Sequence, residues 1–403
     1  MERVILHCDA NGYFASVECI ERPELKLVPM AVCGNPESRH GIILAKNELA
    51  KKYGVQTAET VWQAKKKCPH LTLVPPHHDR YEYYCRLINR IYGEYTDQVE
   101  AFSIDESWLD VTGSRRLFGS GKDIADELRR RVREELGLTI SVGVSFNKVF
   151  AKLGSDYKKP DATTVITREN YQEILFPLPV GDMLFVGTNA AEELRRKGVM
   201  TIGDLANTPA ARLHELLGKQ GEMLWIYANG LDDAPVRRAD EEEAVRSISN
   251  SITFPRDLLG EEDIKTGLLM LADSVGARTR RQQVKGLTVQ IQIKSPELKV
   301  ISRQETLRAP TDSTQEIYHT ALHIIRRSWD MRRPVRMLSV GLTNFAPPDA
   351  PVQTSLFDQA EGRNEKLAKL DCAVDDIRRR FGRDSIGFGQ TIGTDLNGRR
   401  PKD

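Results

Sequence analysis

Short apolar runs and amphipathic stretches alternate along the first 166 residues of the chain. The apolar runs, rich in strand formers, cover residues 4–8, 29–33, 42–44 and 139–144, and helical spacing covers 13–20, 47–53, 79–95 and 122–135. Strands and helices in this rhythm predict an α/β sheet covered by helices. The short strands and small turns between residues 11 and 76 predict a compact insertion into that sheet.

The pattern becomes helical between residues 165 and 235. Phe185–Leu194 and Lys197–Leu205 each pass through a glycine turn into a helical stretch, which predicts a helix-hairpin-helix. The turn amides, at Gly187 for example, can hold nucleic-acid phosphates without reading sequence. An ordinary helical hairpin is the alternative. Prolines and acidic residues then predict a solvated linker at 236–244.

Apolar and polar residues alternate again from residue 245, as they do in half-buried strands. Strands are predicted at 245–254, 288–293, 299–307 and 337–345, with helices at 261–282 and 314–329. This βαββαβ order is ferredoxin-like. A proline-rich break at 347–351 precedes a predicted amphipathic helix at 364–381, and the Gly-rich, basic stretch 387–403 is predicted to be disordered.

Composition places the chain among soluble globular proteins. Its 403 residues suggest two to four domains, and 40% of them are hydrophobic and 29% charged. No apolar run approaches the roughly 20 residues of a membrane span, and Met1 leads into a strand rather than a signal peptide. The six cysteines form no CxxC pair, which is typical of packing thiols in a reducing cytoplasm. We therefore expect a cytoplasmic protein without membrane contact.

Charge is distributed unevenly, although the net charge is only +1. Residues 246–345 contain 16 Lys and Arg against 10 Asp and Glu. Six of these cations are predicted to lie along one nucleic-acid face: Lys294, Arg303, Arg308, Arg332, Arg333 and Arg336. A basic but uninvolved surface is the alternative.

Three carboxylates are the strongest candidates for chemistry. Asp105 and Glu106 adjoin each other between a polar turn and a run of strand formers, and Asp9 ends the first apolar run. The backbone must turn or bulge at Asp105 for both neighbours to serve one site, because successive strand residues face opposite ways. With little else to neutralise them, such acids call for Mg²⁺, and two ions make a clamp for phosphoryl transfer. An exposed acidic hairpin is the alternative.

Four motifs extend this picture: Asp9-Ala-Asn-Gly-Tyr-Phe14, Ser103-Ile-Asp-Glu106, Ser145-Phe-Asn-Lys148 and Lys158-Lys-Pro160. With them in register, the chain resembles the Y-family DNA polymerases, the translesion enzymes of the DinB and UmuC type, over about residues 2–345. The resemblance implies a multidomain α/β right hand. Its parts would be a ferredoxin-like palm (1–10 and 77–166), small fingers (11–76), a helix-hairpin-helix thumb (167–235), a linker (236–244), a βαββαβ little finger (245–345) and a C-terminal tail (346–403).

The resemblance also implies roles for particular residues. Asp9, Asp105, Glu106 and the backbone carbonyl of Ala10 match the ligands of two Mg²⁺ ions, and Asp105 and Glu106 match the catalytic acids. Phe14 matches a steric gate against ribonucleotides, and Lys159 matches a lysine that reaches the triphosphate. Tyr13 beside the gate is more typical of a packing residue, while Ile42 and Leu44 would cover the nascent base pair. Family members commonly carry Tyr and Arg where this chain has Glu48 and Lys51.

The expected function is low-fidelity copying of damaged DNA by a monomer, with primer-template DNA and dNTPs as substrates. The segment Gln353-Thr-Ser-Leu-Phe357 resembles the bacterial sliding-clamp motif, in which Gln353, Leu356 and Phe357 would contact the clamp. Two alternatives remain open from the residues alone. One is a palm-type nucleotidyl cyclase, although the Gly-Gly-acid hairpin of that class is absent at 103–107. The other is a catalytically dead DNA-binding scaffold.

Overall fold

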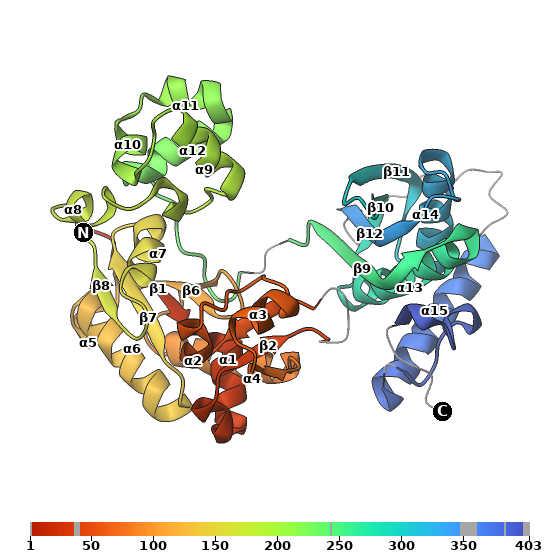
Figure 1. Ribbon diagram of the computed structural model, residues 1–403, viewed down its shortest axis with the longest axis horizontal. Helices are drawn as coiled ribbons and strands as arrows, with labels where there is room; N and C mark the ends of the chain where they lie inside the picture. Colours follow the sequence, from red (N-terminus) through yellow and green to blue (C-terminus); the bar gives the residue numbers. More distant parts are fainter. Residues whose placement is uncertain (1, 36–40, 242–243, 347–360, 383, 398–403) are drawn as a thin grey trace. The chain divides into compact units, whose positions relative to one another are not determined.

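The computed structural model describes residues 2–35, 41–241, 244–346, 361–382 and 384–397. By the contacts between its residues the chain forms two units, one holding the described residues up to 241 and the other those from 244 onward (Figure 1). Each unit has its own sheets and its own apolar core. The multidomain α/β class that the sequence predicts is confirmed.

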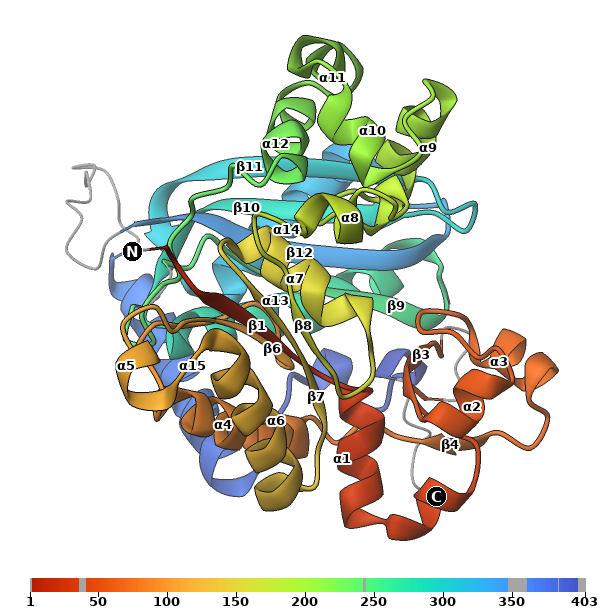
Figure 2. The same ribbon diagram turned by 90° about the vertical axis from the view of Figure 1, so that its left-hand side faces the viewer.

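The first unit is organised around a five-stranded sheet. Its order is β5 (Val99–Ala101), β6 (Glu106–Asp110), β1 (Ile5–Ala10), β7 (Ile140–Ser145) and β8 (Thr163–Val165). Helices α4 (His78–Gly93) and α6 (Gly121–Leu136) cover one face, and α7 (Lys148–Tyr157) lies on the other (Figure 2). The central strand β1 is therefore buried on both sides, which explains its continuous apolar run.

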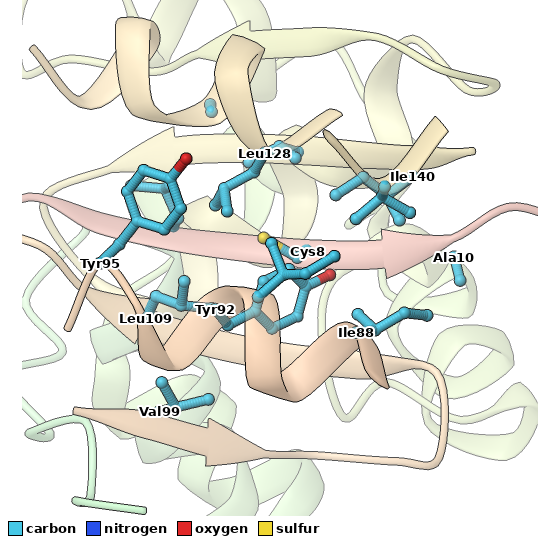
Figure 3. Packing of buried hydrophobic residues seen from close by; sticks show 14 of the residues in the cluster. Cys8, Ala10, Ile88, Tyr92, Tyr95, Val99, Leu109, Leu128 and Ile140 are labelled. Carbon is cyan, nitrogen blue, oxygen red and sulfur yellow. The ribbon is translucent and has the colours of Figure 1, made fainter. Parts of the chain in front are cut away.

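Alternation along β1 divides its side chains between the two faces. Cys8 and Ala10 point into the larger core, where Ile88 and Tyr92 of α4 pack against the strand (Figure 3). Ile5 packs on the opposite side with residues of β6 and α7. Asp9, two residues after His7 and four after Ile5, shares this second face because strand side chains alternate. The strand pattern thus directs Asp9 toward α7.

A tight turn ends β1 and starts α1 (Tyr13–Glu21). Gly12 adopts the left-handed conformation there, with φ of 54°, which a residue without Cβ tolerates. Asn11 fixes the turn, since its amide N–H donates to the carbonyl of Thr139 and its side-chain amide donates to Ser141 Oγ. The position of α1 is thereby tied to β7.

A small three-stranded sheet follows, in the order β3 (Ile43–Lys46), β2 (Met30–Cys33), β4 (Thr72–Val74). Helix α2 (Glu48–Lys52) begins after Asn47, whose side chain accepts the N–H of Ala50. Helix α3 (Val61–Lys67) begins at a capping box formed by Thr60 and Gln63. The sequence predicted the first two strands and α2 but missed α3 and β4.

The remainder of the first unit is helical, as predicted. Its helices are α8 (Tyr171–Leu175), α9 (Thr188–Arg196), α10 (Ile202–Asn207), α11 (Ala210–Leu217) and α12 (Lys219–Ala228). Their core includes Phe150 from the first turns of α7 and Phe146, which precedes that helix. The expectation of a fully solvated linker is wrong at its beginning: Val236 is 2% exposed and packs on the central sheet. An apolar side chain beside this surface gains more from burial than from solvent.

The second unit contains an antiparallel sheet in the order β11 (Val300–Thr311), β10 (Lys285–Lys294), β12 (Val335–Ala346), β9 (Ser247–Leu258). Helices α13 (Gly260–Arg281) and α14 (Thr314–Ser328) join the strands in the βαββαβ order that the sequence predicts. Each helix connects two strands that have one other strand between them. The buried residues Val289, Ile291 and Ile293 give the sheet its helix-covered face; the other face is called the open face below.

The C-terminal stretch corrects one prediction. Helix α15 (Glu361–Phe381) is followed by two short 3₁₀ turns, and Leu396 is 3% exposed within the core of the second unit. Asp371 of α15 accepts the N–H of Thr314 at the start of α14 and pairs with Arg280. The described part of the stretch predicted to be disordered is ordered, because Leu396 is buried in the core and Asp395 pairs with Arg256.

The remaining short elements are η1 (Pro23–Leu27), α5 (Arg115–Phe118), η2 (Val180–Asp182), η3 (Gly389–Thr391) and η4 (Asp395–Asn397). Among the helices that the structure describes, none is long and apolar enough to span a membrane.

Candidate active site

The three carboxylates predicted from the sequence lie at one end of the central sheet. Asp9 and Glu106 are direct cross-strand partners in the antiparallel pair β1 and β6. The backbone bends through residues 102–105, and the N–H of Ala10 donates to the carbonyl of Asp105 at 3.0 Å. The expected departure from strand geometry beside Glu106 is therefore present, and it brings Asp105 next to the end of β1.

A serine links the two neighbouring acids. Ser103 Oγ lies 2.6 Å from Asp105 Oδ1 and 3.1 Å from Glu106 Oε2. Both carboxylates thus point toward the same hydroxyl. The sequence contained Ser103 within the quoted motif, but a hydroxyl two residues before an acid carries no distinctive signal of its own.

Two lysines contact the acids, which contradicts the expectation that little else neutralises them. Lys152 Nζ contacts Glu106 Oε1 and lies 3.2 Å from Asp9 Oδ2. Lys159 Nζ lies 2.7 Å from the same Asp9 oxygen. Both lysines also contact Asp156, at 3.2 Å and 2.7 Å respectively. Sequence analysis found Lys159 but missed Lys152.

The charges shift the pKa values of these groups. Burial raises the pKa of Asp9, and the neighbouring Glu106 raises it further, while Lys159 and Lys152 act in the opposite direction. Burial alone would lower the pKa of Lys152, but the charges of Asp9, Asp156 and Glu106 outweigh it and raise the pKa. The pKa of Lys159 is raised by Asp9 and Asp156 in the same way, against the effect of burial. Both lysines are therefore cationic at neutral pH.

The donor set suits a hard divalent cation. Carboxylate and carbonyl oxygens are the ligands that Mg²⁺ takes, and Asp9 and Glu106 are cross-strand partners whose carboxylates both contact Lys152. In the part of the chain that the structure describes, no three acidic, His or Cys side chains form a ready metal cage. The carboxylates have other partners: Lys152 bridges Asp9 and Glu106, and Asp105 accepts a hydrogen bond from the hydroxyl of Ser103.

Helix α7 positions Lys152 through an unusually close approach to the sheet. A Cβ added to Gly143 of β7 would lie 1.9 Å from the carbonyl oxygen of Ala151 and 2.5 Å from the amide nitrogen of Ser155. Only glycine permits this distance. Buried His7 adds a hydrogen bond between its Nδ1 and Ser155 Oγ at 2.8 Å.

The start of α7 is fixed as well. The side chain of Asn147 caps the helix by accepting the N–H of Phe150. Lys148 pairs with the buried carboxylate of Glu100 at 2.8 Å, and its carbonyl accepts the indole N–H of Trp108. Spacing of four residues places Lys148, Lys152 and Asp156 on one helical face. The sequence carries this spacing as a signal, but it does not show that the face meets the acids.

The aromatic residues after the turn have different environments. Phe14 is half-buried and stacks on Tyr81, with ring centroids 4.1 Å apart and planes at 9°. Tyr13 is 2% exposed, and its hydroxyl donates to the carbonyl of Tyr81 at 2.6 Å. Tyr13 lies beside the predicted gate among the candidates for the nucleotide site, and its burial and inward hydrogen bond are those of a packing residue that supports Phe14.

The candidates of the three-stranded sheet region are more exposed. Glu48 pairs with Lys51 at 3.5 Å, and both side chains are exposed. Ile42 is 40% exposed, whereas Leu44 is half-buried and packs in a small cluster. Lys46, which sequence analysis did not single out, has a pKa lowered first by burial and then by the charge of Lys51. The positive charge of Lys51 thus disfavours a second positive charge on Lys46.

Gly187 is exposed and precedes α9 without a side-chain cap, so the first amides of that helix are open to a ligand.

The basic residues of the second unit do not share one face. Register pairs Arg303 with buried Ile291, which puts Arg303 on the helix-covered face. Lys294 pairs with Val300 on the open face. The prediction that these cations share one face of the sheet is therefore wrong for Arg303. Successive residues of a strand point to opposite faces, so the register decides which face each side chain occupies.

The other basic candidates lie outside this conflict. Arg308 is exposed and lies where the register between β10 and β11 shifts, between Thr306 and Thr311, so alternation does not assign its face. Arg332 and Arg333 are exposed in the turn before β12, where Arg333 lies over the ring of Trp329. Arg336 follows buried Val335 at an irregularity of β12, so alternation does not assign its face. The clamp candidates Gln353, Leu356 and Phe357 lie outside the described residues.

Comparisons with known proteins agree with this geometry. The impB/mucB/samB family model matches residues 8–156, and the model of its C-terminal domain matches residues 245–356. A DNA polymerase IV of Acetivibrio thermocellus is 50% identical over 96% of this chain and 97% of its own length. A DNA polymerase IV of Alkaliphilus oremlandii is 37% identical over 97% of this chain and all of its own.

A solved Y-family DNA polymerase chimera of Dbh and Dpo4 has the same fold, with a TM-score of 0.74. It covers 85% of this chain and 98% of its own at 24% identity.

Taken together, the fold and the relatives define a DNA-directed DNA polymerase, which uses DNA and nucleotides as substrates and depends on a divalent metal. The chain belongs to the impB/mucB/samB family of Y-family DNA polymerases, of the DinB type, and its function is translesion synthesis. The alternatives of a nucleotidyl cyclase and of a dead scaffold are accordingly wrong. Both alternatives were open only while the palm residues were considered without comparison with homologous proteins.

Proposed function

We propose that Asp9, Asp105, Glu106 and the carbonyl of Ala10 hold two Mg²⁺ ions during nucleotidyl transfer to a primer 3′-hydroxyl. The observation that carries this proposal is the cross-strand pair of Asp9 and Glu106, beside which Asp105 shares a serine hydroxyl with Glu106. Mg²⁺ bound there would stabilise the charge that develops on the transferred phosphoryl group. Asp105 and Glu106 are the catalytic acids of this proposal.

The surrounding residues bind and select the nucleotide. Phe14, held flat against Tyr81, is the gate that a ribose 2′-hydroxyl would strike. Lys159 contributes a point charge to the triphosphate. Lys51, with Lys46 beside it, adds positive charge without the bidentate geometry of arginine. Ile42 and Leu44 cover the nascent base pair.

DNA binding is assigned to two surfaces. The open amides at the start of α9, near Gly187, hold a backbone phosphate. The open face of the second unit, together with the exposed Arg308 and the turn containing Arg332 and Arg333, follows the duplex backbone. Arg303 and Arg336 contribute to the long-range field of the basic segment. We propose that the enzyme acts as a monomer, divided into palm, fingers, thumb, linker, little finger and tail at the boundaries given above.

The segment Gln353–Phe357 is proposed to bind a sliding clamp. Two large apolar side chains that enter a partner's pocket contribute on the order of 3–6 kcal/mol before ordering costs. A clamp tether raises the local concentration of the enzyme at the primer end. The double variant Leu356→Ala, Phe357→Ala should keep its unassisted extension rate and lose stimulation by the clamp. A peptide covering 350–360 that shows no heat of binding to the clamp would refute the assignment.

Primer extension tests the metal site. Asp105→Asn and Glu106→Gln should each reduce single-nucleotide incorporation in Mg²⁺ by at least about 10³-fold. Affinity for primer-template, measured by fluorescence anisotropy, should remain within about twofold, because these groups contact metal rather than duplex. A variant that retains more than a few per cent of the rate would exclude its residue from the site. Asp182→Asn, which removes an exposed acid far along the chain, serves as the charge control.

A further inference from the structure

The ammonium group of Lys152 already fills a cation position within the acidic site. It contacts a carboxylate of Asp9, of Glu106 and of Asp156, while only 13% of the side chain is exposed. A lysine ammonium has three N–H donors, and three carboxylates are available to accept them. The ammonium group is therefore positioned to balance part of the negative charge of these carboxylates.

This arrangement sets up a competition. The oxygens of Asp9 and Glu106 that contact Lys152 belong to the proposed metal ligands. A divalent cation bound to them would lie close to the ammonium, and like charges in a partly buried place repel strongly. Metal and ammonium cannot both occupy the space between the two carboxylates.

Asp156 offers Lys152 another position. It lies four residues further along α7, its side chain is 47% exposed, and it contacts both lysines, through Oδ2 to Lys152 and through Oδ1 to Lys159. The lysine stem is flexible, whereas α7 itself is pressed against Gly143. Lys152 can thus move toward Asp156 by rotation of its side chain while the helix stays in place.

Lys159 connects this movement to the nucleotide. In the present structure it contacts Asp9 and Asp156. When a triphosphate draws Lys159 away, Asp9 loses one of its two cations and Asp156 loses one of its own. At Asp9 the metal, which the phosphates help to hold, can replace the lost charge, whereas Lys152 is the cation that remains in contact with Asp156.

We infer that Lys152 is a built-in counter-ion that competes with divalent metal for Asp9 and Glu106, and that Asp156 receives it when a nucleotide arrives. This inference rests on the proposed metal site. It makes metal affinity low in the free enzyme and couples metal entry to nucleotide binding. Lys152 and Asp156 are positioning residues in this account, since neither contacts the reacting atoms.

Metal binding without chemistry provides the test. Free Mn²⁺ is counted by electron paramagnetic resonance during titration of the full-length chain, alone and with dNTP plus a primer that ends in a dideoxynucleotide. Lys152→Gln should bind Mn²⁺ alone at least about tenfold more tightly than the wild type, and dNTP should improve its affinity less. Lys152→Arg, which keeps the charge, should restore the wild-type difference.

Asp156→Asn examines the other half of the inference. Without a carboxylate to receive Lys152, Mn²⁺ affinity in the presence of dNTP should fall several-fold, whereas affinity for Mn²⁺ alone should not rise. Lys148→Gln is the matched control: it breaks a buried ion pair on the same helix, with Glu100, away from the three acids. It should leave Mn²⁺ affinity unchanged.

The outcomes separate the inference from the proposed function. If Lys152→Gln binds Mn²⁺ no more tightly than the wild type, or if Asp156→Asn is unchanged with dNTP, the counter-ion inference is overturned. If the wild type binds no Mn²⁺ even with dNTP and primer-template, the proposed metal site itself fails. Melting temperatures in EDTA verify that each variant is folded, and Mn²⁺ should raise the melting temperature of Lys152→Gln more than that of the wild type.

Discussion

Gly143→Ala tests whether the close packing of α7 against Gly143 of β7 positions the active site. The substitution adds one methyl group inside the fold, in β7, and touches none of the acids or lysines. Its Cβ would lie 1.9 Å from the carbonyl oxygen of Ala151, 2.5 Å from the amide nitrogen of Ser155 and 2.8 Å from the carbonyl carbon of Gly154. All three are backbone atoms, so no side chain can rotate to make room.

The size of the effect follows from these distances. Ordinary van der Waals contact begins near 3.4 Å, so α7 must retreat by roughly 1.5 Å from Gly143. Overpacking of this kind costs typically 1–3 kcal/mol of folding free energy. Lys152 and Asp156 move with the helix, and a misplacement of about 1 Å in a site costs on the order of 10²-fold in rate.

Chemical denaturation and single-nucleotide incorporation measure the two effects. We expect Gly143→Ala to lose about 2–3 kcal/mol of unfolding free energy and about 10²-fold in incorporation rate. Gly93→Ala is the matched control, because a Cβ there meets nothing within 4 Å and lies near the end of a helix. A Gly143→Ala enzyme that is folded and incorporates nucleotide at the wild-type rate would refute the claim that this close packing positions the site.

Three further predictions concern single contacts. Phe14→Ala should raise the kcat/KM for ribonucleotides relative to deoxyribonucleotides, and an unchanged ratio would transfer discrimination to another residue. Lys148→Gln should cost about 2 kcal/mol at neutral pH in urea denaturation, because Glu100 is left buried with fewer partners. Burial raises the folded-state pKa of Glu100, but its bonds to Lys148 and to the Arg237 amide outweigh burial and lower that pKa. The stabilisation that the ion pair contributes is therefore present above the unfolded pKa of roughly 4.3 and is lost as the pH falls through the folded pKa. The difference in unfolding free energy between variant and wild type should shrink in acid. Arg308→Gln should reduce the slope of log K for DNA against log salt by about 0.9, whereas Arg303→Gln, on the helix-covered face, should leave it unchanged.

Much of the fold was predictable because local signals agree with the final packing. The apolar run of β1 reflects burial on both faces, and the helix predicted at 47–53 begins beside a side-chain cap at Asn47. Gly137, which follows the helix predicted at 122–135, adopts the left-handed conformation that ends it. In each case a few neighbouring residues determine the element, so periodicity and capping suffice.

The errors arose where distant contacts decide. Leu396 is buried only because the second unit offers it a place, and nothing in the Gly-rich composition around it indicates such a partner. The side of the sheet that Arg303 faces depends on its pairing with Ile291, and a shift of one residue would reverse it. Composition and charge runs cannot supply a register.

Lys152 shows the same limit within the active site. The resemblance to the family located the acids and Lys159, since the motifs that contain them stand in the family's order along the chain. The contact of Lys152 with Asp9 spans 143 positions of sequence and exists only because Gly143 and His7 hold α7 against the sheet. Helical spacing alone indicates which residues share a face of α7, but it does not indicate which surface that face meets.

Helix α7 therefore joins stability and chemistry in one element. Its buried side closes the face of the sheet opposite the main core, while its charged side carries Lys152, the ammonium group of which contacts Asp9 and Glu106. A substitution that loosens the helix should weaken both the fold and the control of metal entry, whereas Lys152→Gln should alter metal affinity at a smaller cost in packing. The change in metal affinity relative to the change in unfolding free energy should therefore be larger for Lys152→Gln than for Gly143→Ala. This comparison distinguishes the loss of the charge from a displacement of the helix.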